Sequence, residues 1–596
     1  MTARPRALTV TLLMALAVAL FSLAALCSNV AIERFLTGQS TGRLSWGPTL
    51  FRAVMAFHGL ALFVIGVRGL LRPGSSALPA AALRPEKHAR TPWVVLAGLA
   101  GFAFVLRLWR LDSCLWWDEI LTLTDYVRPP LGWIVTTFES QNQHMLYSIL
   151  AHASVRLLGE SGWALRLPSV AFGVASLWPL FLLGRRLMGA RQALLACALM
   201  TVSYHHIWFS QNARGYMGLL FFATLATWLW LEAASRDSQR WWMLYAVVSF
   251  LGLWTHLTMV FVVAAHFVIE VSDRLLAAPA FTGTALRARF ATFSKPALAW
   301  LICGTLALQV YAFSLPEFLR HSLHEGVASE SEWTNPFWVV KESLQGLKVG
   351  WSSAAVVLLG GVLVLAGWLS TFRRDWRAAL GVLLPAVIGA STMLLLAHPI
   401  WPRFFFFSMG FGLLILVQGA MTLPYVLLAP LKAVPRREQQ AGTVALIVAG
   451  LMLIASMLTL PRYYALPKQD FIGARDYVEQ NRRPGEAIVA VGLAGEAYRR
   501  YYAPSWLMVR SKAELDTIQR EHSDTWLVYT IPAQLDALRP DYWSAVQKEF
   551  KVVKVFPGTL NGGDIFICIS ASVPRQHSAG TAQVGQRMET TLAFDQ

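Results

Sequence analysis

The chain has 596 residues, of which 56% are hydrophobic and only 14% are charged. Because a soluble domain typically carries about 25% charged residues, this composition excludes an ordinary soluble protein and favours an integral membrane protein. The formal net charge is +17, but most lysines and arginines fall in short loops between apolar runs, which is typical of membrane topology and not of nucleic-acid binding. The many separate apolar runs predict a helical bundle in the bilayer.

The first 91 residues are predicted to form two transmembrane helices followed by a basic cytoplasmic loop. Apolar runs of about 20 residues, long enough to cross a membrane, lie near 9–31 and 50–71. The first run is longer than the roughly 7–15 apolar residues of a signal peptide, so we interpret it as an uncleaved helix. Arg4 and Arg6 precede this run and place the N-terminus in the cytoplasm.

Residues 92–460 are predicted to form the main transmembrane module. Its apolar runs lie near 92–111, 165–184, 189–207, 216–234, 241–255, 257–272, 297–316, 351–371, 377–398, 403–426 and 441–460. Together with the first two runs they make about thirteen spans, which would place every basic loop in the cytoplasm. These basic loops are 72–90, 185–191, 274–295, 373–377 and 432–437. The loops between them, and the C-terminal region, are then expected on the periplasmic side.

The segment 144–159, "HMLYSILAHASVRLLG", decides this topology. It contains His144, His152 and Arg156, and a helix of this length reaches only about 24 Å at about 1.5 Å per residue. Counting it as a span would invert every later loop. We therefore interpret it as an amphipathic helix at the outer membrane surface, with a further span as the alternative.

Beyond residue 460 the composition changes. Residues 461–570 contain a helical segment, a Pro-Gly turn and runs such as "TWLVYT" and "FKVVKVF" that are typical of strands. We expect a small periplasmic α/β domain there, and a disordered tail at 571–596, which is rich in small and polar residues. The predicted fold class is therefore an all-α polytopic membrane bundle with a small C-terminal α/β domain.

An acidic pair, Asp118 and Glu119, stands in "LWWDEILT" directly after a predicted span. Arg107 and Arg110 precede it at a spacing that would put both on one helical face. A carboxylate can take a proton from an acceptor hydroxyl or amine while an arginine holds a phosphate. The alternative is that the acids are merely solvated and the arginines only reach for the membrane surface.

Two further polar turns are predicted on the same side as the acidic pair. One is "SQNARGYM", with Arg214 and Tyr216, and the other is "HPIWPRFFFF", with Arg403. Either could be a simple turn, and the second could be a helix start with proline in its first turn. Polar clusters that converge on one face of a membrane bundle nevertheless favour a functional cavity.

The sequence leaves the cofactor unknown. Histidines at positions 144, 256, 321, 324 and 398 are all predicted on the outer side. They could bind a divalent metal ion together with Asp118 or Glu119. However, no pair of them has the spacing of a typical metal site, so no ligand cluster supports a metal.

Taken in order, "LWWDEILT", "NQHMLY", "SQNARGYM", "WTHLT" and "HPIWPRFF" resemble the motifs of a GT-C glycosyltransferase. The chain is similar to the branch that includes protein O-mannosyltransferases, aminoarabinose transferases and RgtA-like lipopolysaccharide sugar transferases, over residues of about 92–410. The resemblance implies an enzyme that moves a hexose or pentose from a polyprenyl-phosphate donor, with inversion, to an envelope lipid, polysaccharide or protein. It also implies a periplasmic site in the bacterial inner membrane.

The resemblance further implies roles for single residues. Asp118 would be the catalytic base and Glu119 would position or polarise it. The residues expected to bind donor phosphate or substrate are Arg107, Arg110, His144, Tyr147, Arg214, Tyr216, His256 and Arg403.

The sequence departs from the family at two positions. Asn142 and Asn212 stand where the family often has carboxylates, which weakens the case for a metal and suggests a different acceptor. A transporter or flippase for a lipid-linked sugar is the alternative function, although the matching halves that many transporters show are absent from the sequence.

Overall fold

The computed structural model describes residues 3–71, 91–276, 283–321, 335, 337, 354–429, 437–560 and 562–570. The predicted basic loop 72–90, most of the loop 432–437, the side chains of His321 and His324, and the predicted tail 571–596 lie outside the described residues. The chain forms two compact units, Met1–Pro467 and Lys468–Gln596.

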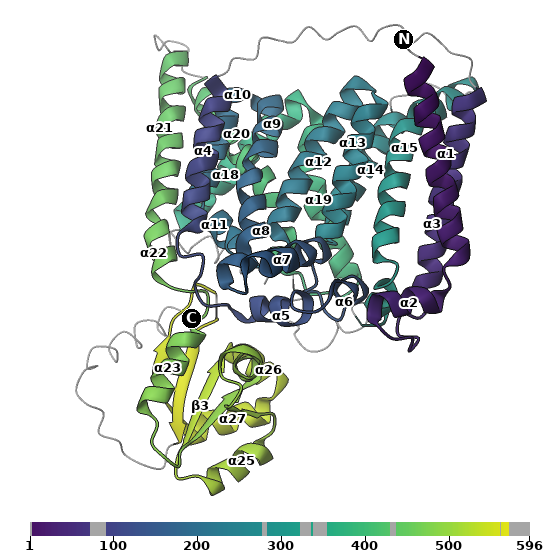
Figure 1. Cartoon of the computed structure of the whole chain (residues 1–596). Helices are drawn as coiled ribbons and strands as arrows, with labels where there is room; N and C mark the ends of the chain where they lie inside the picture. The colour runs from purple at the N-terminus through teal and green to yellow at the C-terminus, as the bar shows by residue number, and fades with distance from the viewer. Residues whose placement is uncertain are drawn as a thin grey trace. The chain divides into compact units, whose positions relative to one another are not determined.

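The first unit is helical, and its long helices stand side by side (Figure 1). They are α1 (Ala3–Leu26), α3 (Gly47–Leu71), α4 (Thr91–Leu108), α8 (Gly162–Ala175), α9 (Leu177–Met188), α10 (Ala190–Thr201), α12 (Tyr216–Arg236), α13 (Gln239–Thr255), α14 (Met259–Leu276), α15 (Gly283–Tyr311), α18 (Ala354–Arg374), α19 (Trp376–Leu395), α20 (Ser408–Leu428) and α21 (Arg437–Leu458). A helix therefore occupies each predicted span, with α8 and α9 sharing one. The predicted all-α membrane bundle is confirmed.

Helix length and composition give the number of helices that could cross a membrane. Among the described residues, nine helical segments are long and apolar enough to cross a membrane, and two bent pairs raise this number to eleven. Two predicted spans do not meet that standard, because α13 has only 17 residues and α14 carries Glu270, Asp273 and Arg274. The count of thirteen thus stays a prediction.

Four short helices lie across one end of the bundle (Figure 1). They are α2 (Asn29–Thr37), α5 (Trp117–Tyr126), α6 (Leu131–Thr136) and α7 (Met145–Leu158). Helix α7 packs against α8 and α13 and buries Met145, Tyr147 and Ala151 while Leu157 is exposed. This crosswise orientation agrees with our interpretation of 144–159 as a helix at the membrane surface.

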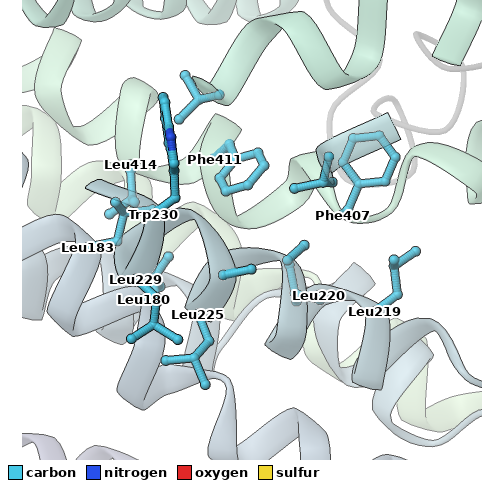
Figure 2. Packing of buried hydrophobic residues seen from close by; sticks show 14 of the residues in the cluster. Leu180, Leu183, Leu219, Leu220, Leu225, Leu229, Trp230, Phe407, Phe411 and Leu414 are labelled. Atoms are coloured by element: carbon cyan, nitrogen blue, oxygen red, sulfur yellow. The ribbon is translucent and has the colours of Figure 1, made fainter. Parts of the chain in front are cut away.

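Helix α12 is the most deeply buried of the candidate spans. Its Trp230 is fully buried and packs among residues of α9 and α20, such as Leu183 and Leu414 (Figure 2). A Cβ at Gly381 of α19 would lie 2.8 Å from the Trp230 ring, so this glycine permits the close approach. Because α12 starts at Tyr216, this packing fixes the position of the polar turn immediately before it.

The second unit contains a five-stranded sheet in the order β2-β1-β3-β5-β4. Its strands are β1 (Ala487–Val491), β2 (Leu507–Val509), β3 (Thr525–Thr530), β4 (Phe550–Phe556) and β5 (Ile565–Ser570). Strand β1 pairs in parallel with β2 and β3, whereas β5 pairs antiparallel with β3 and β4. The helices are α23 (Phe471–Asn481), α24 (Gly492–Ala497), η3 (Tyr498–Tyr502), α25 (Lys512–Glu521), α26 (Pro532–Leu538) and α27 (Pro540–Glu549). The predicted C-terminal α/β fold is confirmed.

Candidate functional site

Asp118 lies in the first turn of α5, where the partial positive charge of the helix start favours a carboxylate. One of its oxygens, Oδ2, accepts hydrogen bonds from the guanidinium groups of both Arg214 and Arg403. The Arg403 Nη1 atom is 3.1 Å from this oxygen. The three polar clusters predicted from the sequence therefore meet at one carboxylate, whose side chain is 14% exposed.

Arg214 is the buried member of this cluster, with a side chain only 3% exposed. Its Nε donates to His144 Nε2 at 3.1 Å, and its guanidinium carbon lies 5.3 Å from the centre of the Tyr216 ring. A Cβ at Gly215 would lie 2.9 Å from His144 Cβ, so glycine is required for this approach. The turn before α12 thus holds Arg214 in one place.

His144 and His256 stack with ring centres 4.6 Å apart. His144 precedes α7, and His256 lies in the turn between α13 and α14. Burial, together with the charges of Arg214 and Arg403, lowers the pKa of His256 to about 3, and burial also lowers the pKa of His144. Both rings are therefore neutral near pH 7. For His144 this agrees with its Nε2 accepting a hydrogen bond from Arg214.

Arg403 is the more exposed cation, with 33% of its side chain exposed. It lies on a single helical turn, η2 (Pro402–Phe405), and its guanidinium carbon is 4.8 Å from the centre of the Trp401 ring. Its Nε has no hydrogen-bond partner among the described residues. The unused donor, Nε, is itself buried, whereas another part of the Arg403 side chain is open to solvent.

A mostly apolar pocket of about 820 Å³, counting the space at its mouth, adjoins the cluster. His144, His256 and Phe404, the neighbour of Arg403, all line it. Its remaining lining residues are Phe138, Gln141, Gln143, Leu257, Thr258, Val260, Phe261, Phe318, Thr392, Met393, Leu396 and His398. The pocket can hold an organic group within reach of the residues that surround Asp118.

Glu119 has different contacts, although it is the next residue. It forms a fully buried ion pair with Arg166 at 2.5 Å, and its Oε1 accepts the backbone N–H of Ala213 at 2.8 Å. It therefore positions the turn that carries Arg214. Arg166 was not among the predicted site residues, although an arginine inside an apolar run is a signal of a functional or structural partner.

The prediction that Arg107 and Arg110 share one helical face is wrong. Helix α4 ends at Leu108, and Arg110 has a φ of 55°, so the helix does not continue through Arg110. Arg107 is fully buried and donates to the carbonyls of Ala103, Met200 and Thr201. Arg110 is exposed and donates to the carbonyl of Tyr464 in α22 (Leu460–Ala465). The structure brings neither side chain to Asp118.

Tyr147, Asn142 and Asn212 form hydrogen bonds with the segments around Asp118 and do not contact its carboxylate in any described hydrogen bond. The buried Tyr147 hydroxyl donates to the carbonyl of Leu165 at 2.6 Å. Asn142 donates to the backbone carbonyl of Asp118 at 3.1 Å, and Asn212 accepts a hydrogen bond from the Trp116 indole at 3.1 Å. Both departures from the family pattern therefore help to hold the loop of Asp118.

Within the described ranges, no group of three or more His, Cys, Asp or Glu side chains is arranged to hold a metal ion. The polar side chains described next to the Asp118 carboxylate are cationic arginines, which repel a metal cation. Two cationic arginines share one carboxylate, so the cluster is suited to binding an anion at an arginine in place of Asp118.

Residues 143–306 match the model of a family described as dolichyl-phosphate-mannose-protein mannosyltransferase. The matched segment includes His144, Arg166, Arg214, Tyr216 and His256, whereas Asp118 and Arg403 lie outside it. This match confirms the resemblance drawn from the sequence. No curated protein matches the chain.

Several solved structures are similar to the chain. ArnT from Cupriavidus metallidurans in the apo state has a TM-score of 0.47 and 14% identity, covering 80% of this chain and 98% of that one. AglB from Archaeoglobus fulgidus, in complex with an inhibitory peptide and a dolichol-phosphate, has a TM-score of 0.48 and 11% identity, covering 80% and 74%. EmbB from Mycobacterium smegmatis has a TM-score of 0.38 and 12% identity, covering 70% and 44%. All three TM-scores are below 0.5.

Proposed function

Given the family match over residues 143–306, we propose that this chain is a membrane glycosyltransferase that uses a polyprenyl-phosphate-linked sugar. The observation that carries the proposal is the Asp118 carboxylate held between Arg214 and Arg403. A catalytic base and a phosphate-binding arginine are the two groups that such a transfer needs. Here they already contact each other.

In the proposed reaction the donor phosphate takes the place of Asp118 as the partner of Arg403. The arginine pairs with phosphate through two parallel hydrogen bonds. When its side chain turns, the Nη1 donor released from Asp118 and the buried, unpartnered Nε both become available. Once Arg403 has turned to the phosphate, Asp118 keeps only Arg214, and its carboxylate is available to accept a proton. The isoprenoid tail dissolves in the bilayer beside the helices.

Transfer then requires one displacement at the anomeric carbon. The acceptor hydroxyl or amine attacks that carbon, its proton passes to Asp118, and the carbon–oxygen bond to phosphate breaks. The electron pair of this bond leaves with the polyprenyl phosphate, whose charge the arginine stabilises. A single displacement of this kind inverts the anomeric configuration, and the acceptor is an envelope lipid, polysaccharide or protein.

We place the reaction at the periplasmic side of a bacterial inner membrane. The support is the loop-charge pattern of the sequence, which puts the N-terminus in the cytoplasm and the turns of Asp118, Arg214 and Arg403 on the opposite side. The C-terminal domain is then periplasmic as well. A cysteine-labelling reagent that does not cross membranes should fail to label Arg191→Cys, an exposed position, in intact cells, and labelling there would contradict this topology.

The function is tested by mass spectrometry of envelope glycolipids and glycans from cells that make the wild type, Asp118→Asn or Asp125→Asn. Asp125 lies in the same helix α5 and is the matched control. We expect a sugar-bearing product with the wild type and Asp125→Asn, and none with Asp118→Asn at equal protein level. A normal product with Asp118→Asn would contradict the base assignment. A wild-type protein that moves the lipid-linked sugar across the membrane without transferring it would indicate the transporter alternative.

A further inference from the structure

A second pocket lies within the C-terminal unit, at the carboxyl ends of its parallel strands. It has a volume of about 760 Å³, counting the space at its mouth. The residues that directly follow β1, β2 and β3 are Gly492, Arg510 and Ile531, and all three line it. The pocket therefore lies at the C-terminal ends of three neighbouring strands, between the loops that follow them.

The sheet order gives this end of the sheet the topology that typically binds ligands. The chain leaves β1 for β2 on one side, then crosses to β3 on the other side of β1. Open α/β sheets bind ligands in the crevice outside the carboxyl ends of the strands, at the point where the strand order reverses. In this unit that point is the boundary between β1 and β3, where the pocket lies.

The backbone on both sides of this boundary has a left-handed conformation. Gly492 has a φ of 56°, and Ile531 has a φ of 48°. Such a conformation is uncommon for a β-branched residue. The rest of the unit holds Ile531 in this conformation, so the shape of the pocket rim is set before any ligand binds.

The charged groups at the pocket favour an anion. Arg510 and Arg539 line it together with one acid, Glu496. That acid already pairs with Arg499, Arg500 and Arg510. Arg539 is exposed and forms no ion pair with any described residue. Guanidinium groups pair well with carboxylates and phosphates.

The wall of the pocket also contains an unused donor. Tyr542 lines it and is 3% exposed, and its buried hydroxyl has no hydrogen-bond partner among the described residues. Buried polar groups normally have a partner. Burial raises the pKa of Tyr542, so its hydroxyl stays protonated and able to donate.

We propose that this pocket binds a small sugar-like anion, with a phosphate or carboxylate on Arg539 and Arg510 and a hydroxyl or ring oxygen on Tyr542. Leu493, Met508 and Leu535 line the same pocket and give the ligand an apolar surface to pack on. All of its lining residues belong to the second unit, and the proposal does not depend on the proposed transfer reaction. The site gives the C-terminal unit a recognition function of its own.

The test is isothermal titration calorimetry on the full chain in detergent micelles, with glucose 1-phosphate, glucuronate and uncharged glucose as probes. We expect one or both anions to bind and glucose not to bind. Binding of glucose 1-phosphate alone would identify phosphate as the recognised group, and binding of glucuronate alone would identify a carboxylate. Binding of neither anion, or equal binding of glucose, would overturn the proposal.

Variants then locate the binding within the pocket. Arg539→Gln should raise the Kd of the bound anion at least about tenfold, since hydrogen bonds to charged groups contribute more than neutral ones, and Tyr542→Phe should raise it by a smaller factor. Arg520→Gln is the matched control, because Arg520 lies on α25 and does not line the pocket. Equal Kd values for the wild type and Arg539→Gln would show that the anion binds elsewhere.

Discussion

Two carboxylates that are neighbours in the sequence have contrasting environments. Glu119 and Arg166 form an ion pair in which neither side chain is exposed. Asp118 pairs with two arginines, and 14% of its own side chain and 33% of that of Arg403 are exposed. The two acids therefore differ in solvent exposure and not in charge. The fully buried Glu119–Arg166 pair, called the sealed pair below, stabilises the fold, whereas the partly exposed Asp118–Arg403 pair can open so that Arg403 binds a substrate anion.

The largest effect is expected from breaking the sealed pair. Glu119→Gln leaves Arg166 charged and buried without its counter-ion, which typically costs about 3–5 kcal/mol. Thermal unfolding in detergent should show a large fall in stability. The control is Glu160→Gln, because the Arg128–Glu160 pair is about 40% exposed on both sides and such pairs contribute at most about 1 kcal/mol. Equal melting temperatures for the two variants would contradict the contrast.

Removing the exchangeable partner should affect donor binding and leave folding intact. Arg403→Gln is expected to raise the KM for the polyprenyl-phosphate sugar about 10- to 100-fold, as hydrogen bonds to charged groups contribute about 1.5–3 kcal/mol. Arg110→Gln is the control, since Arg110 is exposed and donates to the carbonyl of Tyr464. An equal change of KM in both variants would show that Arg403 does not bind the donor phosphate.

The buried histidine next to the site should make stability depend on pH. The pKa of His256 is about 3 in the folded protein and about 6.5 when unfolded, so the unfolded state binds more protons between these values. Stability is therefore lost as pH falls below about 6.5, by about 2 kcal/mol at pH 5 from this group. The free energy of unfolding of His256→Asn should therefore fall by about 2 kcal/mol less than that of the wild type between pH 7 and pH 5. Parallel pH profiles for the two proteins would show that the pKa of His256 is not lowered by folding.

The smallest effect is expected from a change that keeps the charge. Arg214→Lys retains a cation beside Asp118 but loses the fixed geometry that reaches His144 and Tyr216. We expect kcat to fall about tenfold, which corresponds to about 1.4 kcal/mol, with little change in the donor KM. A larger effect on KM than on kcat would assign Arg214 to donor binding instead.

Sequence patterns predicted the helices well because a segment that crosses the bilayer must be apolar over about 20 residues, which is visible in the sequence itself. The same patterns failed at Arg110, since the run near 92–111 continues beyond the end of α4 and hides the turn. They also missed Arg166, which lies inside such a run but pairs with Glu119, 47 positions away. The sequence predicted only that Arg214, Arg403 and Asp118 lie on the same side of the membrane. It could not predict that both arginines contact Asp118, because these contacts depend on packing between helices that are distant in the sequence.

The central claim is that Asp118 accepts the acceptor proton, and purified protein tests it most directly. The measurement is the rate of polyprenyl-phosphate release by wild type and Asp118→Asn, with a polyprenyl-phosphate sugar as donor and an envelope lipid extract as acceptor. A general base contributes about 10²- to 10⁴-fold, so the rate should fall at least about 100-fold in Asp118→Asn, measured on protein that is fully folded at the assay temperature. A rate that stays within about tenfold of the wild type would contradict the account.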